Sequence, residues 1–357
     1  MLMKEFDYVI KGAGCAGLSL AYELNQNQKL EKKTLAIVEP RQIYDRDKTW
    51  SFWKTINHNF DDCVIKNWSN FTVNIKGKMH HLKCDDTPYQ TVNSGIFYKK
   101  IISNLKSNSN ISFFKDINEI NTERSLIFNS VPNKGEFKDR LWQHFFGVEI
   151  ETPKDTFDDK IFNLMDFDCD QRNSVHFYYT LPFSKNKALI ETTWLSSLNN
   201  EKIMDYENQI KEYLEKKLKI KDYKIIFKEK GAIPLFKQIN FTKNNEINIG
   251  TAGGMTRLST GYTFLNIQEH SKYIRENLEK IKNKKKYTIG KKYHFLDEIF
   301  IRVLKDNPKL MPEIFFKMFE VESKKVINFL SNKSNLLEDI SVILKMPKVI
   351  FIKALFK

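Results

Sequence analysis

The sequence predicts an α/β protein in which a parallel sheet, interrupted along the chain, surrounds an inserted and mainly antiparallel sheet, with a helical region at the C-terminus. The opening unit, 6–40, reads as strand, glycine turn, helix and strand. A strand, a glycine-rich bend and a helix return more than two hundred residues later, at 247–281. Between these two units, strand-like runs dominate 141–239, with one amphipathic helix at 200–218.

The opening unit carries a nucleotide-binding pattern. The β-rich run 6–10 leads into Gly12, Gly14 and Gly17, which have the G-x-G-x-x-G spacing. Gly12 allows the tight turn, Gly14 leaves room for a pyrophosphate, and Gly17 lets the helix pack closely on the sheet. The next strand ends on Glu39, 22 positions after Gly17, where an acid can accept hydrogen bonds from ribose hydroxyls. We therefore predict a dinucleotide cofactor held by these four residues, and the pattern fits FAD and NAD nearly equally.

The stretch 41–53 reads as irregular and ends in Lys48-Thr49-Trp50-Ser51-Phe52-Trp53. These aromatic residues predict either a hydrophobic staple over the sheet edge or a wall near the cofactor or an apolar substrate. The elements expected next are hairpin strands at 71–75 and 78–82, a helix at 94–105, and parallel strands at 111–114 and 125–130 of a doubly wound sheet. The strands of the inserted sheet are expected at 145–150, 163–167, 175–182, 187–194 and 222–229.

The returning strand at 247–250 opens a turn of small residues that includes Gly253, Gly254, Thr260 and Gly261. Backbone amides in such a bend, followed by a helix start, can contact the anionic parts of a cofactor. The nucleotide-binding domain is accordingly expected to be discontinuous. The expected boundaries are 1–70, 95–140 and 240–285 for that domain, 71–94 and 141–239 for a substrate-binding sheet domain, and 286–357 for a helical C-terminal region broken at Pro308, Pro312 and Pro347.

Composition narrows the possible partners. The formal charge of +14 favours anionic partners such as nucleic acid, a membrane surface or phosphorylated ligands, although lysine is abundant throughout and the excess can equally be compositional bias. No nucleic-acid motif accompanies the charge. The four cysteines lack the close spacing of a metal or redox motif, and nothing resembling a signal peptide precedes the first strand, so we expect a cytoplasmic protein with reduced thiols and no metal.

No apolar run approaches the ~20 residues that span a bilayer, so any membrane contact is expected at the surface. The segment 342–357 mixes large apolar residues with four lysines. It predicts either a docked helix that covers the core or a helix that lies on an anionic membrane face.

Taken together, several segments resemble the flavin-dependent lycopene cyclases of bacterial carotenoid synthesis. The resemblance covers nearly the whole chain. The matching segments are T-W-S-F at 49–52, F-x-G-x-x-I-E at 145–151, L-M-D-F at 164–167, Y-x-L-P at 179–182, L-I-E at 189–191, and the most specific one, G-x-A-x-G-x-x-x-x-S-T-G-Y, at 250–262.

The resemblance implies a Rossmann-like FAD-binding domain of the glutathione-reductase type, FAD in its reduced form, NADPH as reductant, and lycopene or a related polyene as substrate. It also implies that the acid of the L-I-E motif, here Glu191, is the essential catalytic carboxylate. Some family members carry a second acid directly after it, where this chain has Thr192. An apolar substrate dissolved in the bilayer further implies peripheral association with the inner face of the cell membrane.

Forming a β-ionone ring from an acyclic ψ-end requires a proton delivered to an alkene, stabilisation of a carbocation and removal of a neighbouring proton, without net oxidation. A buried carboxylic acid with a raised pKa can deliver that proton. Glu191 suits this role, and the rival interpretation is a solvent-facing strand glutamate. Asp166 is a second candidate, which either positions Glu191 or binds on the flavin side, or else makes a structural hydrogen bond. Trp50, Phe52 and Trp194 are expected to stabilise the cation.

Two other functions fit parts of the sequence. A redox flavoenzyme, such as a monooxygenase or a prenyl reductase, would share the nucleotide-binding turns and would consume one reductant per product. A flavin-binding protein without catalysis that presents a basic face to membranes or nucleic acid is the other alternative.

Overall fold

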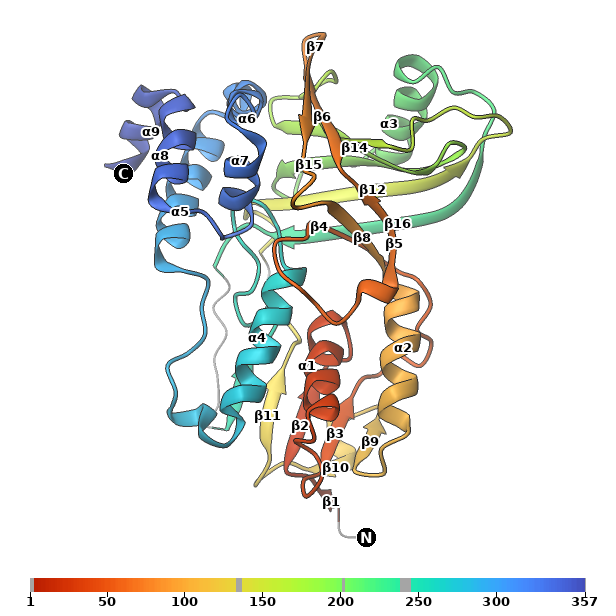
Figure 1. Cartoon of the computed structure of the whole chain (residues 1–357), viewed down its shortest axis with the longest axis vertical. Coiled ribbons are helices and arrows are strands. Elements are labelled where there is room, and N and C mark those ends of the chain that lie inside the picture. Colours follow the sequence, from red (N-terminus) through yellow and green to blue (C-terminus); the bar gives the residue numbers. More distant parts are fainter. Residues whose placement is uncertain (1–2, 133–136, 201–202, 238–244, 357) are drawn as a thin grey trace.

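The computed structural model describes residues 3–132, 137–200, 203–237 and 245–356. One end of the molecule is built on a five-stranded sheet whose neighbouring strands all run parallel, in the order β17-β11-β2-β3-β9 (Figure 1). Its strands are β2 (Tyr8–Lys11), β3 (Leu35–Val38), β9 (Ile111–Phe114), β11 (Leu126–Asn129) and β17 (Glu246–Asn248). These confirm the parallel strands that the sequence predicts, including the late return of the chain to this sheet.

Helices cover one face of the parallel sheet. They are α1 (Cys15–Gln26), α2 (Ser94–Lys106) and α4 (Phe264–Asn277), and the short helix Leu278–Asn283 continues α4. Their buried side chains form one core with Ile10, Leu35 and Ile37. On the opposite face, Val9 and Ala36 pack in a smaller core.

That smaller core differs from a doubly wound sheet. The segment between β9 and β11 forms a single 3-10 turn, Ile117–Glu119, and then β10 (Ile120–Asn121), which pairs with β1 (Lys4–Glu5). A short strand pair thus stands where a second helical layer would pack. The segment is too short and too polar to provide an amphipathic helix of ordinary length.

The other end of the molecule is a seven-stranded sheet in the order β16-β12-β15-β14-β13-β6-β7. Its strands are β6 (Asn70–Ile75), β7 (Lys78–Lys83), β12 (Trp142–Glu151), β13 (Ile161–Asp166), β14 (Val175–Ser184), β15 (Lys187–Ser196) and β16 (Lys224–Pro234). The pairing is antiparallel except between β13 and β6. The inserted, mainly antiparallel sheet is therefore present, and the hairpin 70–83 joins its edge.

A three-stranded sheet lies between the two larger ones and corrects one expectation. Its strands, in the order β4-β8-β5, are β4 (Thr49–Trp53), β8 (Tyr89–Asn93) and β5 (Val64–Trp68), which follows the 3-10 turn Asp61–Cys63. The end of 41–53 is thus a strand and not an irregular segment. The flanking sequence gives no sign of a strand here, and β4 forms because its backbone pairs with β8.

The amphipathic helix expected at 200–218 is shorter than predicted. It comprises α3 (Tyr206–Glu212) and a π-helical turn, Tyr213–Lys217, while residues 201–202 lie outside the described residues. The domain segment expected at 240–285 likewise begins partly outside them, at 240–244.

The C-terminal region is helical: α5 (Lys291–Asp306), a 3-10 turn at Pro308–Leu310, α6 (Met311–Met318), α7 (Ser323–Leu330), α8 (Leu336–Lys345) and α9 (Lys348–Leu355). Figure 1 shows these helices beside the large sheet, and α6 contacts β6. Pro347 separates α8 from α9 as expected. Pro312 instead lies in the first turn of α6, where a missing N–H costs no helical hydrogen bond.

Candidate functional site

The glycine turn between β2 and α1 has the steric character of a nucleotide-binding turn. Gly12 has φ +88°, and a Cβ there would lie 2.4 Å from Ser130 Oγ. A Cβ on Gly17 would lie 1.9 Å from the carbonyl oxygen of Gly12, so only glycine lets the helix approach this closely. A Cβ on Gly14 would meet no atom within 4 Å. The space beside Gly14 is therefore open, as the approach of a pyrophosphate requires.

The start of α1 suits an anion. Gly14 is its N-cap, no side chain caps the helix, and its first turn contains no acidic residue. Glu39, just after β3, accepts hydrogen bonds from the backbone N–H groups of Ala13 at 2.8 Å and Arg41 at 3.0 Å. Backbone N–H groups of the first turn and the Glu39 carboxylate thus lie side by side at the edge of the sheet where a dinucleotide would be held.

The second glycine-rich bend packs directly on the first turn of α1. Gly250 has φ +61°, and a Cβ there would lie 2.6 Å from the Cβ of Ala16. A Cβ on Gly253 would lie 2.5 Å from the carbonyl oxygen of Asn248. Gly254, with φ +81°, has open space beside it. The structure thus brings together the two glycine-rich turns that the sequence separates by more than two hundred residues.

The end of the same bend reaches the large sheet. A Cβ on Gly261, where φ is +71°, would lie 2.6 Å from Gln143 Oε1 on β12. Thr260 Oγ1 accepts a hydrogen bond from the N–H of Tyr262 at 3.2 Å. Tyr262 in turn accepts one from Trp53 Nε1 at 3.2 Å, and burial raises the pKa of Tyr262 to about 12. This bend therefore joins the two glycine-rich turns to the seven-stranded sheet.

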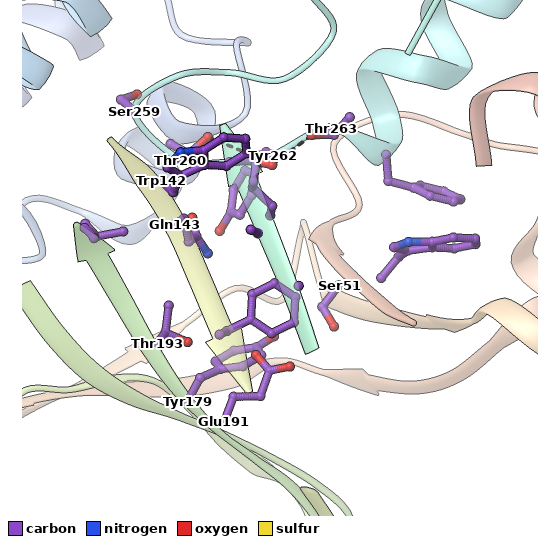
Figure 2. Close-up of a pocket in the computed structure, with 18 of the residues that line it drawn as sticks. Ser51, Trp142, Gln143, Tyr179, Glu191, Thr193, Ser259, Thr260, Tyr262 and Thr263 are labelled. Atoms are coloured by element: carbon purple, nitrogen blue, oxygen red, sulfur yellow. Dashed lines mark hydrogen bonds between the residues drawn. The ribbon is translucent and has the colours of Figure 1, made fainter. Parts of the chain in front are cut away.

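A cavity of about 540 Å³ lies between these parts. It extends from Cys15 and Thr251 at the glycine turns to Glu191 on β15. Figure 2 shows the side chains of Glu191 and Tyr179 at one end of this space and Trp142, Thr260 and Tyr262 at the other. Most of the lining is apolar and comes from the sheets, from the start of α4 and from the C-terminal helical region: Trp50, Phe145, Leu164, Met165, Phe177, Leu195, Phe264, Phe315, Met318, Phe319 and Leu330.

Glu191 faces this cavity and is not solvent-facing, since only 9% of its surface is exposed. Strand alternation places Thr193 and Leu195 on the same face. Burial raises the pKa of Glu191 well above its ordinary value, the charge of Glu229 raises it further, and Lys48 opposes them. The raised pKa favours the protonated form of this side chain.

The neighbours of Glu191 in the chain point the other way. Thr192 Oγ1 donates to Gln209 Oε1 at 2.5 Å and hydrogen-bonds His176 Nε2 at 2.8 Å. Trp194 stacks on His176 with ring centroids 3.9 Å apart and is fully buried. Trp194 therefore cannot offer its face to a cation in the cavity, because alternation puts it on the far side of the sheet from Glu191.

The aromatic residues of 49–53 have two different roles: one lines the cavity, and the others pack inside the protein. Trp50 lines the cavity. Phe52 stacks on Phe264 at 4.7 Å, and Trp53 is fully buried against Phe71 and Tyr89. Only Trp50 of these three belongs to the cavity wall, and the other two hold the small sheet in place.

Asp166 does not line the cavity. Its carboxylate accepts hydrogen bonds from Tyr213 Oη at 2.8 Å and from the N–H of Asp168 at 3.0 Å, and burial raises its pKa. Of the three roles that the sequence left open for Asp166, these contacts correspond to the structural hydrogen bond.

Sequence reasoning missed Glu229, a buried carboxyl close to Glu191. It lies on β16, 4% exposed, and Gly147 of β12 pairs with Glu191 on one side and with Glu229 on the other. Burial raises the pKa of Glu229, while hydrogen bonding to Glu191 and Thr49 and the charge of Arg46 oppose that rise. The available signal was the glycine inside a strand, since an interior glycine often marks a close approach of other groups.

Comparison with known proteins agrees with this geometry. Residues 7–355 match the family described as "Lycopene cyclase protein".

The chain belongs to the lycopene cyclase family.

One relative of this lycopene cyclase family member is the chloroplastic neoxanthin synthase of Solanum tuberosum, 25% identical over 293 residues. That match includes 72% of this chain and 57% of the relative, so the chain spans little more than half of the relative's length.

Solved structures share the fold at low identity. A geranylgeranyl bacteriochlorophyll reductase-like protein from Thermoplasma acidophilum is 12% identical, with a TM-score of 0.61 over 99% of this chain and 96% of that one. A flavin-dependent brominase is 10% identical, with a TM-score of 0.60 over 92% and 93%. A flavoprotein/dehydrogenase from Cytophaga hutchinsonii is 10% identical, with a TM-score of 0.58 over 95% and 99%. The predicted fold class, a Rossmann-like domain with an inserted sheet, is thus that of known flavoproteins.

Proposed function

We propose that this chain is a lycopene β-cyclase that converts acyclic ψ-ends of lycopene or a related polyene to β-ionone rings without net oxidation. One observation carries the proposal: a buried glutamic acid, Glu191, whose pKa is raised well above its ordinary value by burial, lines a mostly apolar cavity that adjoins the glycine-rich turns. Such a group can protonate an alkene where water would otherwise compete.

The proposed steps balance without an oxidant. The O–H bond of Glu191 breaks as a C–H bond forms at the terminal alkene. The resulting carbocation is attacked by a second double bond of the polyene, which forms the C–C bond of the ring. A C–H bond beside the new cation then breaks, and its proton returns to the Glu191 carboxylate. Trp50 and Phe145, which line the cavity, exclude water and offer aromatic faces to the cation.

We infer that the cofactor is FAD, held by Gly12, Gly14, Gly17 and Glu39 and by the bend that contains Gly253, Gly254, Thr260 and Gly261. The open space beside Gly14 and Gly254 supports this inference, because a backbone without a Cβ can approach a pyrophosphate closely. In its reduced, anionic form, with NADPH as reductant, this cofactor would supply negative charge near the carbocation.

We further propose that the substrate arrives from the cytoplasmic face of the cell membrane. Among the described residues, no helix has both the length and the apolar character needed to cross a bilayer. Helices α8 and α9 dock on the protein through Val342 and Ala354, yet they expose large apolar residues on their outer side. These are Leu336, Leu337, Ile340, Ile343, Leu344, Val349, Ile352, Leu355 and, just after α9, Phe356.

The position of these helices supports a route into the cavity. Phe315 and Met318 of α6 and Leu330 of α7 line the cavity, and α8 packs against both α6 and α7. The apolar surface of α8 therefore lies one helical layer from the cavity. The exposed Lys348 and Lys353 of α9 add positive charge, which suits an anionic membrane as the source of a polyene.

The proposal is tested by expressing the native chain, Glu191→Gln and Glu151→Gln in bacteria that accumulate lycopene. Glu151 is a half-exposed glutamate of β12 that pairs with Lys187 at 3.3 Å, outside the cavity. We expect a change from red to yellow pigment with the native chain and Glu151→Gln, and none with Glu191→Gln. The product must have the mass of its substrate. A product changed in mass, formed with one reductant consumed per turnover, would establish a monooxygenase or a prenyl reductase instead.

A further inference from the structure

We propose that Glu229 is the positioning residue of the catalytic acid: it shares one proton with Glu191 and keeps Glu191 protonated between turnovers. This inference rests on the proposed function for its consequence in catalysis. The pairing itself rests on the geometry of the sheet.

Three neighbouring strands place the two carboxyl groups face to face. Gly147 lies in register with Glu191 of β15 and with Glu229 of β16. A Cβ on Gly147 would lie 2.7 Å from Glu191 Cγ and 3.1 Å from Glu191 Oε1. The Glu191 side chain therefore leans over the glycine toward Glu229, through space that any other residue at 147 would fill. The glycine is what allows the two acids to meet.

The hydrogen bonds indicate which acid holds the proton. Glu229 Oε2 accepts a hydrogen bond from the N–H of Thr49 at 2.8 Å, which favours its ionised form. Glu229 Oε1 is buried and has no partner at ordinary hydrogen-bond geometry among the described residues. A proton on Glu191, directed across Gly147, is the donor that this oxygen lacks. Glu191 also lines the cavity and Glu229 does not, so the proton rests on the acid that can reach the substrate.

Charged groups around the pair favour one negative charge and not two. Arg46 lowers the pKa of Glu229, but it also forms an ion pair with Glu149 at 2.5 Å and is therefore already partly neutralised. Lys48 acts on Glu191 and donates its own hydrogen bonds to backbone carbonyl groups. Two cations, one of them paired, balance a single carboxylate better than two in a buried site.

The remaining titratable groups that face Glu191 are tyrosines. Tyr179 is its neighbour on β14 and donates a hydrogen bond to Tyr89 Oη at 2.9 Å. Burial raises the pKa of both hydroxyls well above the ordinary value, so neither adds a charge near neutral pH. Glu229 is thus the group whose charge bears most directly on Glu191.

The pair gives Glu191 two properties that a lone acid would lack. When the O–H bond of Glu191 breaks, two carboxylates face the new carbocation, and their attraction for it offsets their mutual repulsion. Once the cation has formed the ring, the same repulsion drives Glu191 to recover a proton from the neighbouring C–H bond. Glu229 therefore keeps Glu191 protonated before the reaction and makes it an effective base after it. Glu229 itself has the same protonation state at the start and the end of each turnover.

The test compares the pH profile of cyclisation for the native protein, Glu229→Gln and Glu229→Asp, with Glu151→Gln as control. Glu229→Gln removes the neighbouring negative charge, so Glu191 loses its proton at lower pH, and the high-pH limb of activity should move down by more than about 1 unit. Glu229→Asp keeps the charge one methylene farther away and should move the limb less, in the same direction. The control should leave the limb unchanged.

Infrared titration of the purified protein without substrate provides a second measurement. The native protein should show a protonated carboxyl band that Glu191→Gln removes and that Glu229→Gln makes titrate at lower pH. An equal loss of activity at every pH in Glu229→Gln, with the band titrating as in the native protein, would show that Glu229 is only structural. If the native band depends on Glu229 as expected but lycopene is not cyclised, the pairing stands and the proposed reaction fails.

Discussion

Replacing Gly147 by Ala tests directly whether the meeting of Glu191 and Glu229 controls catalysis. The new Cβ would project into the space over which the Glu191 side chain passes, 2.7 Å from its Cγ and 3.1 Å from its Oε1. The substitution removes no functional group and changes no charge. Its effect must therefore come from displacing the acid.

The size of the effect follows from these distances. The optimal separation of nonbonded carbon atoms is ~3.5–4.0 Å, so Glu191 Cγ must move by roughly 1 Å to make room for the methyl group. A displacement of about 1 Å in a reacting group can reduce the rate by about 100-fold. Overpacking a buried site costs about 1–3 kcal/mol of stability, so the variant should still fold.

Val148→Ile is the matched control. Val148 follows Gly147 in β12, is equally buried, and packs with Ile190 and Tyr178 on the opposite face of the sheet. The added methylene should cost about 1–3 kcal/mol in the same way but leave the cavity unaltered. Cyclisation rates and thermal unfolding are measured for both variants. If Gly147→Ala cyclises lycopene at the rate of Val148→Ile, the close approach of the two acids has no catalytic role.

Three further predictions concern the cofactor, the membrane and pH. Gly14→Ala should fold normally, since its Cβ meets no atom within 4 Å, yet it should weaken FAD binding by about tenfold or more by obstructing the pyrophosphate. Gly290→Ala, at the N-cap of α5, is the control, and equal flavin absorbance in the two purified variants would contradict the assignment. Replacing both Leu337 (75% exposed) and Phe356 (84% exposed) by Ser should reduce sedimentation with anionic phospholipid vesicles at least about tenfold, because each side chain contributes up to about 1.5–3 kcal/mol on burial. The control, Ile225→Ser on β16, replaces another exposed apolar residue and should not reduce it. An equal loss of sedimentation in both variants would exclude α8 and α9 as the membrane contact. Finally, a carboxyl whose pKa is raised on folding makes the protein less stable as the pH rises above the pKa of that carboxyl in the unfolded chain, about 4.3. Glu191→Gln lacks this carboxyl, so above that pH its unfolding free energy, measured with denaturant, should rise relative to that of the native protein by up to about 1.4 kcal/mol per pH unit. If the two unfolding free energies change with pH in parallel, the pKa of Glu191 is not raised.

Local patterns in the sequence were sufficient for the elements whose signals are short-range. The glycine spacing at 12–17 predicts a turn from the residues alone. The structure agrees, because a Cβ on Gly12 or Gly17 would clash with its neighbours. Strand alternation likewise places Glu191 on the face opposite Ile190 and Thr192, since the period of side chains along a strand does not depend on what packs against it. The family resemblance added the role proposed for the acid and the cofactor proposed for the glycine-rich turns.

Only the tertiary structure decided which side chains meet. Trp194 follows Glu191 closely in sequence but lies on the other face of the sheet, whereas Glu229 lies 38 positions away and reaches it across Gly147. The strand at 49–53 exists because β8 pairs with it, and the cavity is closed by α6 and α7, which come from the far end of the chain. Pairing register and packing between distant segments depend on the whole chain at once, so no local pattern contains them.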